Sequence, residues 1–590
     1  MSETSLNSHC TDNGELVIEP RFTGRTYVAV LRVLVRGESA FVDKVDLAKD
    51  GAREHFVRQV AGQLPGVDPG EVETQLLRLC DARSATLQTA DELAAEGGQE
   101  PTVADALVQI TFAEAKLCHD EDFNAYASIE VDDHAETWPV RSKGFRLWLR
   151  RRLREEQNKS AHSEAVSTAI EEIESKAYFD APEADVFVRL GEHEDGIWLD
   201  LADENWRTVC VNASGWHLVE KTPPIRFIRS RGMLPLPAPE RGGNVDDLRK
   251  FLNVSDDSDF VLLVGWLLAC LRPRGPYPIL CLYGEQGSAK STACKMLRAL
   301  VDPNSALLRG EPRDPRDLII TATNSWVLGY DNLSYVRPWL SDAFCRLSTG
   351  GGFATRELYT DREEVIFDAQ RPLIMNGITD LANRSDLLDR TLAVTLSPIP
   401  ETQRRDERTL WNSFHAARPK ILGALLDAVA IGLADGGKTQ LTRMPRMADF
   451  ALWVAACEPG LGWPAGTFAD AHAENRASAN DTAIEASVVG EVLRTFMASR
   501  ASWEGTATEL LGELEKIADE RTRHRKAWPG SARKLSGDLR RIAPNLRAKG
   551  VRVEFKKSGK RLISLGRNGS PMDGMEAPEP THRPEAQLLF

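Results

Sequence analysis

Hydrophobic and polar residues alternate in distinct blocks along this chain, and the blocks predict a protein of mixed α/β structure. Apolar residues three and four apart predict helices at 102–118, at 142–176 and over most of 403–500. An amphipathic helix with Phe56, Val60 and Leu64 on one face is also expected. Short runs of β-branched and aromatic residues predict strands at 26–31, 40–43, 196–201, 206–211, 215–219 and 225–228.

The longest apolar run covers residues 260–271. A helix that crosses a bilayer needs about 20 apolar residues. We therefore expect a buried helix at 260–271 and no association with a membrane.

Breaks in the pattern divide the chain into domains. The strongest break is 234–243, which contains three prolines and two glycines. We expect a multidomain α/β chain with the following divisions: a disordered tail at 1–15, an N-terminal α+β domain at 16–100 with a linker or frayed helix end at 91–101, a second α+β domain at 101–240, a P-loop domain at 244–435, a helical region at 436–490, a winged-helix domain at 491–567 and a disordered tail at 568–590.

Composition narrows the class of protein. The chain has 590 residues and a net charge of −14, which argues against a uniformly basic coat for nucleic acid. Its nine cysteines include no Cys-x-x-Cys pair, which favours reduced, buried thiols. The polar first residues do not resemble a signal peptide, so a cytoplasmic location is expected.

One motif carries specific chemistry. An apolar run at 278–282 predicts a buried strand, and 293–300 predicts a helix. The segment between them has the composition of a P-loop, whose backbone N–H groups cradle phosphates. Lys290 would reach the β- and γ-phosphates of ATP, and the Ser291 hydroxyl would bind Mg²⁺. The residues expected to line the nucleotide are Gly284, Glu285, Gln286, Gly287, Ser288, Ala289, Lys290, Ser291 and Thr292.

Ala289 departs from the motif, because glycine is usual before the lysine. A methyl group is tolerated there only where φ is negative, since a side chain disfavours positive φ. We therefore expect a negative φ at Ala289.

Three downstream residues complete a candidate ATPase. Asp331 ends the apolar run 325–330, about 40 residues after the P-loop, and matches a Walker B acid that helps to hold Mg²⁺. Asn376 ends another strand and could orient the attacking water. Arg390 precedes the strand 391–396 and could reach the γ-phosphate bound by a neighbouring subunit.

This order of motifs resembles superfamily 3 helicases, most of all the helicase half of primase–helicases from phages, satellites and large DNA viruses. The resemblance covers residues 260–400 and implies an AAA+-like ring ATPase, often a hexamer, that translocates on single-stranded DNA through its pore. It implies that Asn376 is the sensor and Arg390 the arginine finger, with Arg384 as a substitute. It also implies that the segment from Thr349-Gly350-Gly351 to Tyr359 forms a pore hairpin in which Arg356 and Tyr359 touch DNA.

Asn332 departs from the family, because relatives usually carry a second acid there to polarise the attacking water. Glu285 or another nearby acid could substitute, Asp331 alone could suffice at a reduced rate, or the protein could bind ATP and hydrolyse it poorly. The sequence leaves these alternatives open.

The C-terminal region is strongly basic. Residues 521–567 contain 16 Lys or Arg and two acids, an electrostatic footprint for a polyanion. A helix beginning at Thr506, a basic helix at 531–542 and an alternating hairpin at 551–565 give a winged-helix order, expected to bind duplex or forked DNA. The candidate DNA-binding residues are Arg533, Lys534, Arg540, Arg541, Lys556, Lys557 and Lys560.

Two functions follow. The first is an ATP-dependent DNA helicase or translocase that acts in the replication of a phage or mobile element. The second is a DNA-binding initiator or regulator that uses nucleotide as a switch. The last residues, 586–590, are similar to short peptides that dock into bacterial sliding clamps, which makes the clamp a further candidate partner.

Overall fold

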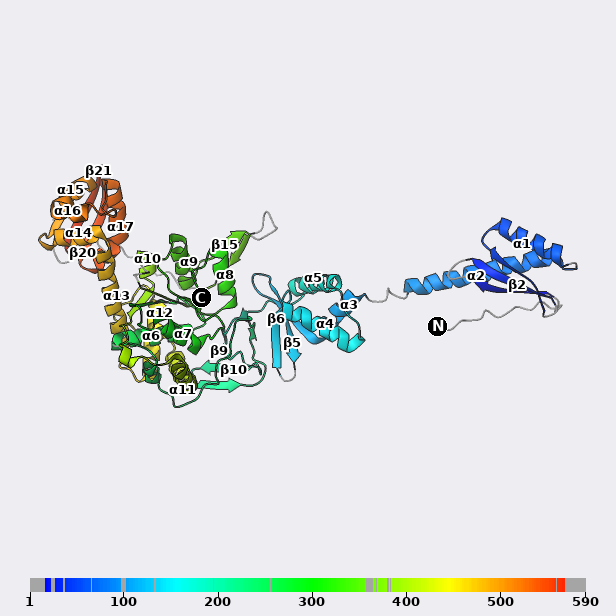
Figure 1. Ribbon diagram of the computed structural model, residues 1–590, viewed down its shortest axis with the longest axis horizontal. Coiled ribbons are helices and arrows are strands. Elements are labelled where there is room, and N and C mark those ends of the chain that lie inside the picture. Colours follow the sequence, from blue (N-terminus) through cyan, green and yellow to red (C-terminus); the bar gives the residue numbers. More distant parts are fainter. Residues whose placement is uncertain are drawn as a thin grey trace, which may run out of the picture. The chain divides into compact units, whose positions relative to one another are not determined.

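The computed structural model describes residues 16–22, 27–35, 38–64, 66–96, 102–131, 134–194, 196–254, 256–356, 364–367, 369–378, 381, 384–558 and 560–567. The tails expected at 1–15 and 568–590 lie outside the described residues. The fold is mixed α/β (Figure 1). It contains several hydrophobic cores. It divides into two compact units, Met1–Ile110 with Leu149–Ala169, and Thr111–Trp148 with Ile170–Phe590.

The first unit holds a three-stranded antiparallel sheet of β1 (Leu16–Phe22), β2 (Val28–Val35) and β3 (Glu38–Asp46), in the order β1-β2-β3. Helices α1 (Asp50–Gln63) and α2 (Pro69–Glu96) follow, and Phe56 and Val60 of α1 are buried, as predicted. The sequence predicted only two of the three strands, because Glu19, Pro20 and Arg21 hide the alternation of β1. The chain is also helical as far as Glu96, where a linker or frayed end was expected from residue 91.

Helices α3 (Val103–Glu114), α4 (Lys143–Gln157) and α5 (Ser163–Phe179) come next along the chain. The single helix predicted at 142–176 is wrong, because Asn158 takes a positive φ of 52° just after α4 and breaks the helical path. Residues 115–118, predicted as the end of a helix, belong to a strand.

The second unit begins with β-structure. An antiparallel sheet contains β4 (Ala115–His119), β5 (Ala125–Val131) and β6 (His134–Pro139). A four-stranded sheet has the order β11-β10-β9-β8, from β8 (Leu190–His193), β9 (Gly196–Asp200), β10 (Thr208–Asn212) and β11 (Gly215–Val219). Two short strands, β7 (Val186–Phe187) and β12 (Arg226–Phe227), pair in parallel.

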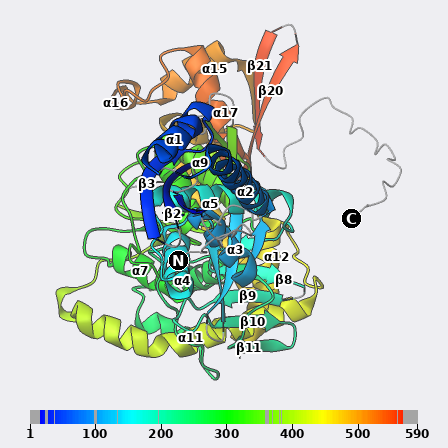
Figure 2. The ribbon, with the colours of Figure 1, turned by 90° about the vertical axis from the view of Figure 1, so that its right-hand side faces the viewer.

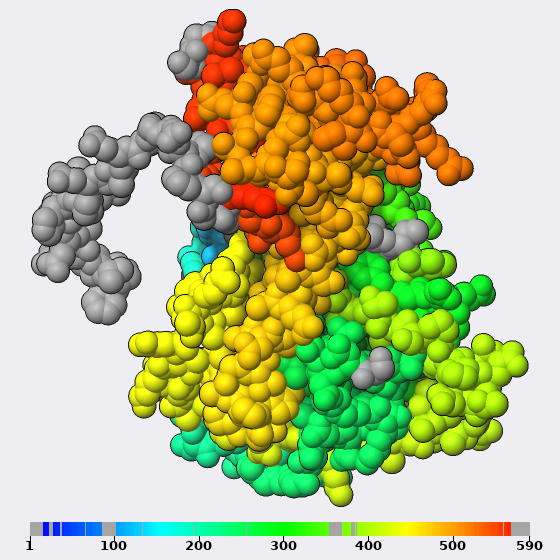
Figure 3. All heavy atoms as spheres, turned by 90° about the vertical axis from the view of Figure 1, so that its left-hand side faces the viewer, coloured from blue at the N-terminus to red at the C-terminus, as the bar shows by residue number. Residues whose placement is uncertain are grey.

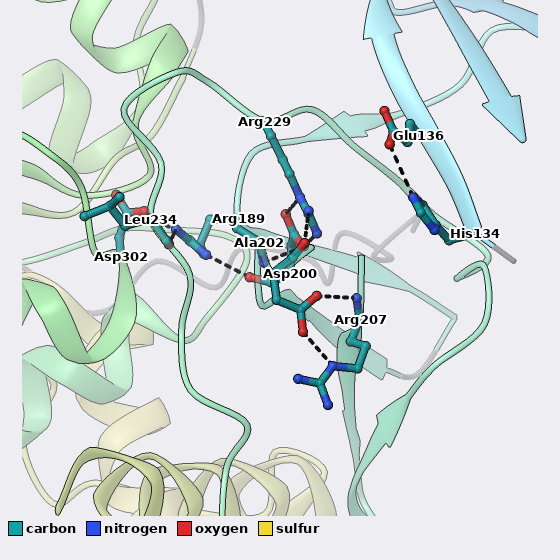
Figure 4. A network of polar contacts seen from close by, with 10 residues as sticks. His134, Glu136, Arg189, Asp200, Ala202, Arg207, Arg229, Leu234 and Asp302 are labelled. Atoms are coloured by element: carbon teal, nitrogen blue, oxygen red, sulfur yellow. Dashed lines mark hydrogen bonds and ion pairs between the residues drawn. The ribbon is translucent and has the colours of Figure 1, made fainter. Parts of the chain in front are cut away.

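A buried polar network ties this β-structure to the part of the unit that follows (Figure 4). Arg189 is fully buried; its Nε lies 3.1 Å from an oxygen of Asp302, and its Nη1 donates to the carbonyl of Asp200 at 3.0 Å. Asp302 directly follows α7 (Lys290–Val301), and Nη2 of Arg298, near the C-terminal end of that helix, lies 3.6 Å from the other oxygen of Asp302. Arg229 binds the carboxylate of Asp200 through two nitrogens. The end of α7 is therefore held by a buried carboxylate shared between two arginines.

A parallel sheet forms the centre of the second unit. Its strands are β13 (Ile279–Tyr283), β14 (Leu328–Tyr330), β17 (Leu373–Gly377) and β18 (Thr391–Thr395), in the order β14-β17-β13-β18. Leu280 and Leu282 of β13 belong to one hydrophobic core, whereas Ile279 and Cys281 belong to another. Both faces of the sheet are therefore covered, which is typical of a parallel sheet.

Helices cover this sheet. They are α6 (Asp257–Cys270), α7, α8 (Pro315–Asn324), α9 (Pro338–Thr349), the short α10 (Ser385–Leu388), α11 (Glu407–Asp435), α12 (Ala448–Cys457) and α13 (Thr467–Ala486), with 3-10 turns at Val245–Lys250, Glu401–Gln403 and Glu458–Leu461. The buried helix predicted at 260–271 is α6, and the helices predicted within 403–500 are present.

The C-terminal module, residues 488–567, has its own core. It contains α14 (Val488–Ala498), β19 (Ser502–Thr506), α15 (Ala507–Ile517), α16 (Glu520–Arg523), α17 (Ala532–Ala548), β20 (Val551–Ser558) and β21 (Lys560–Arg567). The strands form an antiparallel sheet β19-β21-β20, and the β20–β21 ribbon stands out at one edge (Figure 2). Leu535, Leu539 and Ile542 of α17 are buried in this core, as their spacing predicted.

None of the helices in the described part of the chain is long and apolar enough to span a bilayer.

Candidate functional site

The loop 284–289 connects β13 to α7, which is the strand–loop–helix order that the sequence predicted. Gly284 has a φ of 146°, and a Cβ placed on it would lie 2.4 Å from the carbonyl oxygen of Leu396. Gly287 has a φ of 86°. Both positions therefore require glycine. The backbone after β18 approaches so closely that only a bare Cα leaves room for it.

Ala289 contradicts the expectation of a negative φ. It lies at φ 61° and ψ 27°, in the left-handed region, as the residue that caps the N-terminus of α7. The loop keeps a conformation that favours glycine, and the alanine bears the strain. An L-residue in this conformation costs about 1–2 kcal/mol.

Lys290 folds back over the loop. Its Nζ donates to the carbonyl oxygens of Gly284 and Glu285, each at 2.7 Å, and lies 3.4 Å from Oγ of Ser288. The ammonium group is therefore held inside the curve of the loop. Of the other predicted loop residues, Ser288 is buried, Thr292 is half-buried, and Glu285, Gln286 and Gly287 are exposed.

Four polar residues from three elements form a hydrogen-bonded chain beside this loop. Ser291 Oγ donates to Asp331 Oδ1 at 2.7 Å. Asn376 Nδ2 donates to the same oxygen at 2.8 Å, and Asn376 Oδ1 accepts from the backbone N–H of Asn332 at 2.9 Å. Asn376 is only 1% exposed, so its amide is fixed. The structure thus brings together three residues that the sequence predicted from separate motifs.

The base of this chain is buried. Cys294, on the next turn of α7, is fully buried, and its Sγ lies 3.5 Å from Asn376 Nδ2. Burial raises the pKa of the Cys294 thiol to about 12, so the group stays neutral. With a neutral, apolar floor under Asn376, the half-buried carboxylate of Asp331 is the charged group of this chain.

Two residues near the loop were missed by sequence reasoning. Asn253 donates through Nδ2 to the carbonyl oxygens of Ser288, at 3.2 Å, and Ser397, at 2.5 Å. Arg404 also lies beside the loop, because its Nη2 would be 3.6 Å from a Cβ atom placed on Gly287. The pair Arg404-Arg405 after the last strand of the sheet was a usable signal for a basic group, whereas nothing marked Asn253.

Arg390 is not part of this cluster. Its Nη1 donates to the carbonyl of Asp386 at 2.8 Å. Among the described residues it makes no hydrogen bond or ion pair with the loop. Arg384 pairs with Asp342 at 3.0 Å.

The predicted pore hairpin has strands β15 (Phe353–Arg356) and β16 (Glu364–Phe367), and Arg356 lies opposite Glu364 in the antiparallel backbone register. Tyr359 lies outside the described residues.

The basic residues predicted on the C-terminal module are mostly at its surface. Arg533, Lys534, Arg540, Arg541, Lys557 and Lys560 are exposed, and Lys556 is half-buried. Some have partners within the module: Arg540 stacks over Phe555 at 4.2 Å, Lys534 donates to the Trp528 carbonyl at 3.1 Å, Arg541 pairs with Asp538 at 2.6 Å and Lys556 pairs with Glu504 at 2.8 Å. Arg533, Lys557 and Lys560 make no ion pair within the described part of the chain.

No group of three or more His, Cys, Asp or Glu side chains able to hold a metal ion occurs within the described ranges. A divalent cation held by Ser291 and Asp331 would therefore need most of its ligands from phosphate and water.

Comparison with solved structures gives weak likenesses. The C-terminal region of NrS-1 is 11% identical with a TM-score of 0.34, and the match covers 78% of this chain and 98% of that one. The SCCmec type IV Cch helicase is 10% identical with a TM-score of 0.42, over 77% of this chain and 94% of that one. TM-scores below 0.5 do not establish a shared fold. No curated protein matches the chain.

Comparison with family models gives two matches. Residues 245–482, which contain the central sheet and the site beside it, match the model of the actinomycete integrative conjugative element replication protein. Residues 489–579, which contain the C-terminal module, match the model of the RepA C-terminal domain of the same elements. The central and C-terminal parts of this chain are thus similar to the two domains of one replication-protein family, and they support a role in mobile-element DNA replication.

Proposed function

We propose that this protein is an ATP-driven DNA translocase or helicase that acts in mobile-element replication. The observation that carries the proposal is the chain Ser291–Asp331–Asn376 beside a glycine-bearing loop that holds Lys290. A hydroxyl in the first turn of α7, with a carboxylate and a buried amide at the carboxyl ends of two adjacent parallel strands, suits Mg²⁺ binding and nucleotide hydrolysis.

The loop fits a phosphate chain in two respects. Its path needs glycine at positions 284 and 287, so its backbone can approach a ligand closely. The loop also ends at the N-terminus of α7, where free N–H groups and the helix dipole favour an anion. Lys290, now bonded to neutral carbonyls, would turn to the β- and γ-phosphates, and Ser291 and Asp331 would hold Mg²⁺, which screens phosphate charge.

When Asp331 binds the cation, the Nδ2 group of Asn376 would be released from Asp331 and could donate a hydrogen bond to a water near the γ-phosphate. Arg404, at the edge of the loop, adds a positive charge that the sequence pattern did not indicate. Arg390 would complete the site from a neighbouring subunit. Such an arrangement requires a closed assembly, for which a ring such as a hexamer is proposed.

The AAA+-like core and the winged-helix identity of the C-terminal module belong to this proposal. Support for the first is a parallel sheet with the loop strand β13 between β17, which carries Asn376, and β18, which follows Arg390. Support for the second is the exposed basic face of α17 and the β20–β21 ribbon, which together suit duplex or forked DNA. Single-stranded DNA would pass Arg356 in the pore.

A second function, a nucleotide-gated initiator with little hydrolysis, is favoured by Asn332. Its side chain is an amide at the place where a general base is usual, and an amide cannot accept the proton. The two functions differ in turnover and not in nucleotide binding.

One preparation distinguishes them. Wild-type protein, Lys290→Ala and the control Lys295→Ala, which changes another lysine of α7, are compared for nucleotide binding, Mg²⁺-dependent ATP turnover with and without single-stranded DNA, and strand displacement. We expect wild type and Lys295→Ala to hydrolyse ATP and displace a strand, and Lys290→Ala to do neither. Binding without turnover would favour the initiator, and no binding would refute both functions.

DNA binding by the module is tested separately through its salt dependence. Changing Lys557 and Lys560 to alanine should flatten the plot of log K against log salt by about 0.9 for each phosphate of duplex DNA that the variant no longer neutralises. The control changes Lys438 and Arg443, two exposed basic residues outside the module. Equal slopes for both double variants would contradict a DNA-binding role for the ribbon.

A further inference from the structure

Helix α13 belongs to both the central sheet region and the C-terminal module. Phe468, near its N-terminus, is part of the core on one face of the sheet, and Ile484, near its C-terminus, is part of the module's core. Figure 1 shows it running between the two, and its atoms join those of the module without a gap in Figure 3. One rigid element of 20 residues thus spans both parts.

In its middle, α13 grips the edge of the sheet. The Asn475 side chain is buried and makes two hydrogen bonds with Ala393 of β18: it accepts from the backbone N–H at 3.2 Å and donates to the carbonyl at 2.5 Å. β18 is an edge strand of the sheet, and the Asn475 amide bonds its backbone where a further strand could otherwise pair. These two hydrogen bonds therefore tie β18 to α13.

The next residue, Arg476, holds the turn that presents Arg390. One of its nitrogens pairs with the carboxylate of Asp389, and Nη1 donates to the Leu388 carbonyl at 2.5 Å. Arg446 pairs with the second oxygen of Asp389 at 2.7 Å. Asp389 is 20% exposed and Arg476 is 22% exposed, so this pair is partly shielded from water. The residue directly before the candidate arginine finger is thus clamped from two sides.

At its other end, α13 is tied to the basic helix of the module. Asn480 accepts a hydrogen bond from Nδ2 of Asn545, on α17, at 3.0 Å, and both side chains are buried. Asp481 pairs with Lys549, just after α17. Helix α17 also contacts α10, which leads into Asp389. The surface expected to meet DNA and the turn that bears Arg390 therefore share one support.

We propose that Arg476 is a positioning residue for Arg390, and that α13 links DNA binding at the C-terminal module to ATP turnover at the neighbouring subunit's loop. The inference rests on the proposed function. In physical terms, Arg390 stabilises transition-state charge only when its guanidinium is held in place, and a displacement of about 1 Å can cost about 10²-fold in rate.

The first test separates this role from a structural one. Arg476→Ala should lower kcat for ATP about 100-fold with KM unchanged, as Arg390→Ala should, and Arg476→Lys should recover part of the rate by keeping a cation near Asp389. Arg494→Ala, which removes an exposed ion pair of α14 with Glu485, is the control and should keep the wild-type rate. If Arg476→Ala does not fold, Asp389→Asn replaces it, because it keeps the volume and removes the charge with which Arg476 pairs.

Mixed rings test whether the effect acts on the neighbour. Lys290→Ala subunits have an impaired loop and an intact finger, and Arg476→Ala subunits have the reverse. In a random 1:1 ring, roughly a quarter of the interfaces pair an intact loop with an intact finger, so turnover should recover above that of either variant alone. No recovery would show that Arg476 acts on its own subunit and would overturn the proposal.

The second test concerns the link to DNA. Asn545→Ala removes the hydrogen bond between α13 and α17 far from the loop. We expect basal turnover to stay at the wild-type value and stimulation by DNA to disappear, whereas retained stimulation would overturn the link. Wild-type protein without any turnover would instead refute the proposed function, and a normal kcat for Arg476→Ala in an active wild-type background would refute the positioning role alone.

Discussion

Replacing Ala289 by glycine should stabilise the protein, although glycine in the middle of a helix normally destabilises it. Ala289 lies at φ 61° and ψ 27°, where the Cβ approaches the following carbonyl. This conformation costs an L-residue about 1–2 kcal/mol. Glycine removes that cost but gives the unfolded chain more freedom, worth about 0.5–1 kcal/mol. The difference predicts a net gain of about 0.5–1 kcal/mol.

The matched control is Ala293→Gly, four residues along the same helix. Ala293 is 3% exposed and its φ is not positive, so glycine there loses helix propensity and a buried methyl group. We expect a loss of about 1–2 kcal/mol. The same chemical change one turn apart should therefore have opposite signs.

Thermal unfolding without nucleotide, followed by far-UV circular dichroism, measures both variants. For a domain of about 150–250 residues, 1 kcal/mol corresponds to about 2–4 °C in Tm. Ala289→Gly should therefore raise Tm by about 1–4 °C, and Ala293→Gly should lower it. Nucleotide affinity should change less than about threefold, because the loop already has the path that glycine prefers. A fall in Tm for both variants would refute the argument that Ala289 stores backbone strain.

Three further predictions concern other parts of the second unit. Asp302→Ala should lower the free energy of unfolding by about 3–5 kcal/mol, because it leaves Arg189 and Arg298 buried without a counter-charge; a urea midpoint equal to that of wild type would contradict this. Burial, with Arg476 nearby, lowers the pKa of His472 to about 4 in the folded protein, whereas the unfolded value is about 6.5. The unfolded chain therefore takes up a proton at a higher pH than the folded protein does. As pH falls from about 6.5 to 4, the free energy of unfolding should decrease by up to about 3 kcal/mol. His472→Phe should therefore flatten the fall of the urea midpoint between pH 7 and 4.5, and unchanged curves would exclude this role. Asn332→Glu supplies a proton acceptor beside Asp331 and should raise kcat for ATP at least about tenfold, whereas an unchanged steady-state rate would mean that another group already serves as base.

Local pattern was sufficient for most elements of the fold. The buried helix α6, the strand–loop–helix around Lys290 and the amphipathic spacing of α17 were all predicted, because each depends on residues close in sequence. Where local signals conflicted, prediction failed: β1 was hidden by polar residues, and the break at Asn158 was missed because a left-handed turn leaves the hydrophobic spacing intact.

The candidate site shows the same division. The sequence by itself determined which side chains could serve it, since Lys290, Ser291, Asp331 and Asn376 follow the ends of predicted strands, and strands of a parallel sheet end at one edge. Only the tertiary structure decided that Ala289 has a positive φ, that Arg404 and Asn253 lie beside the loop, and that Arg476 clamps the turn before Arg390. The reason is physical: backbone path and side-chain packing are fixed by segments far apart in the chain, and periodicity within one segment carries no record of what will pack against it.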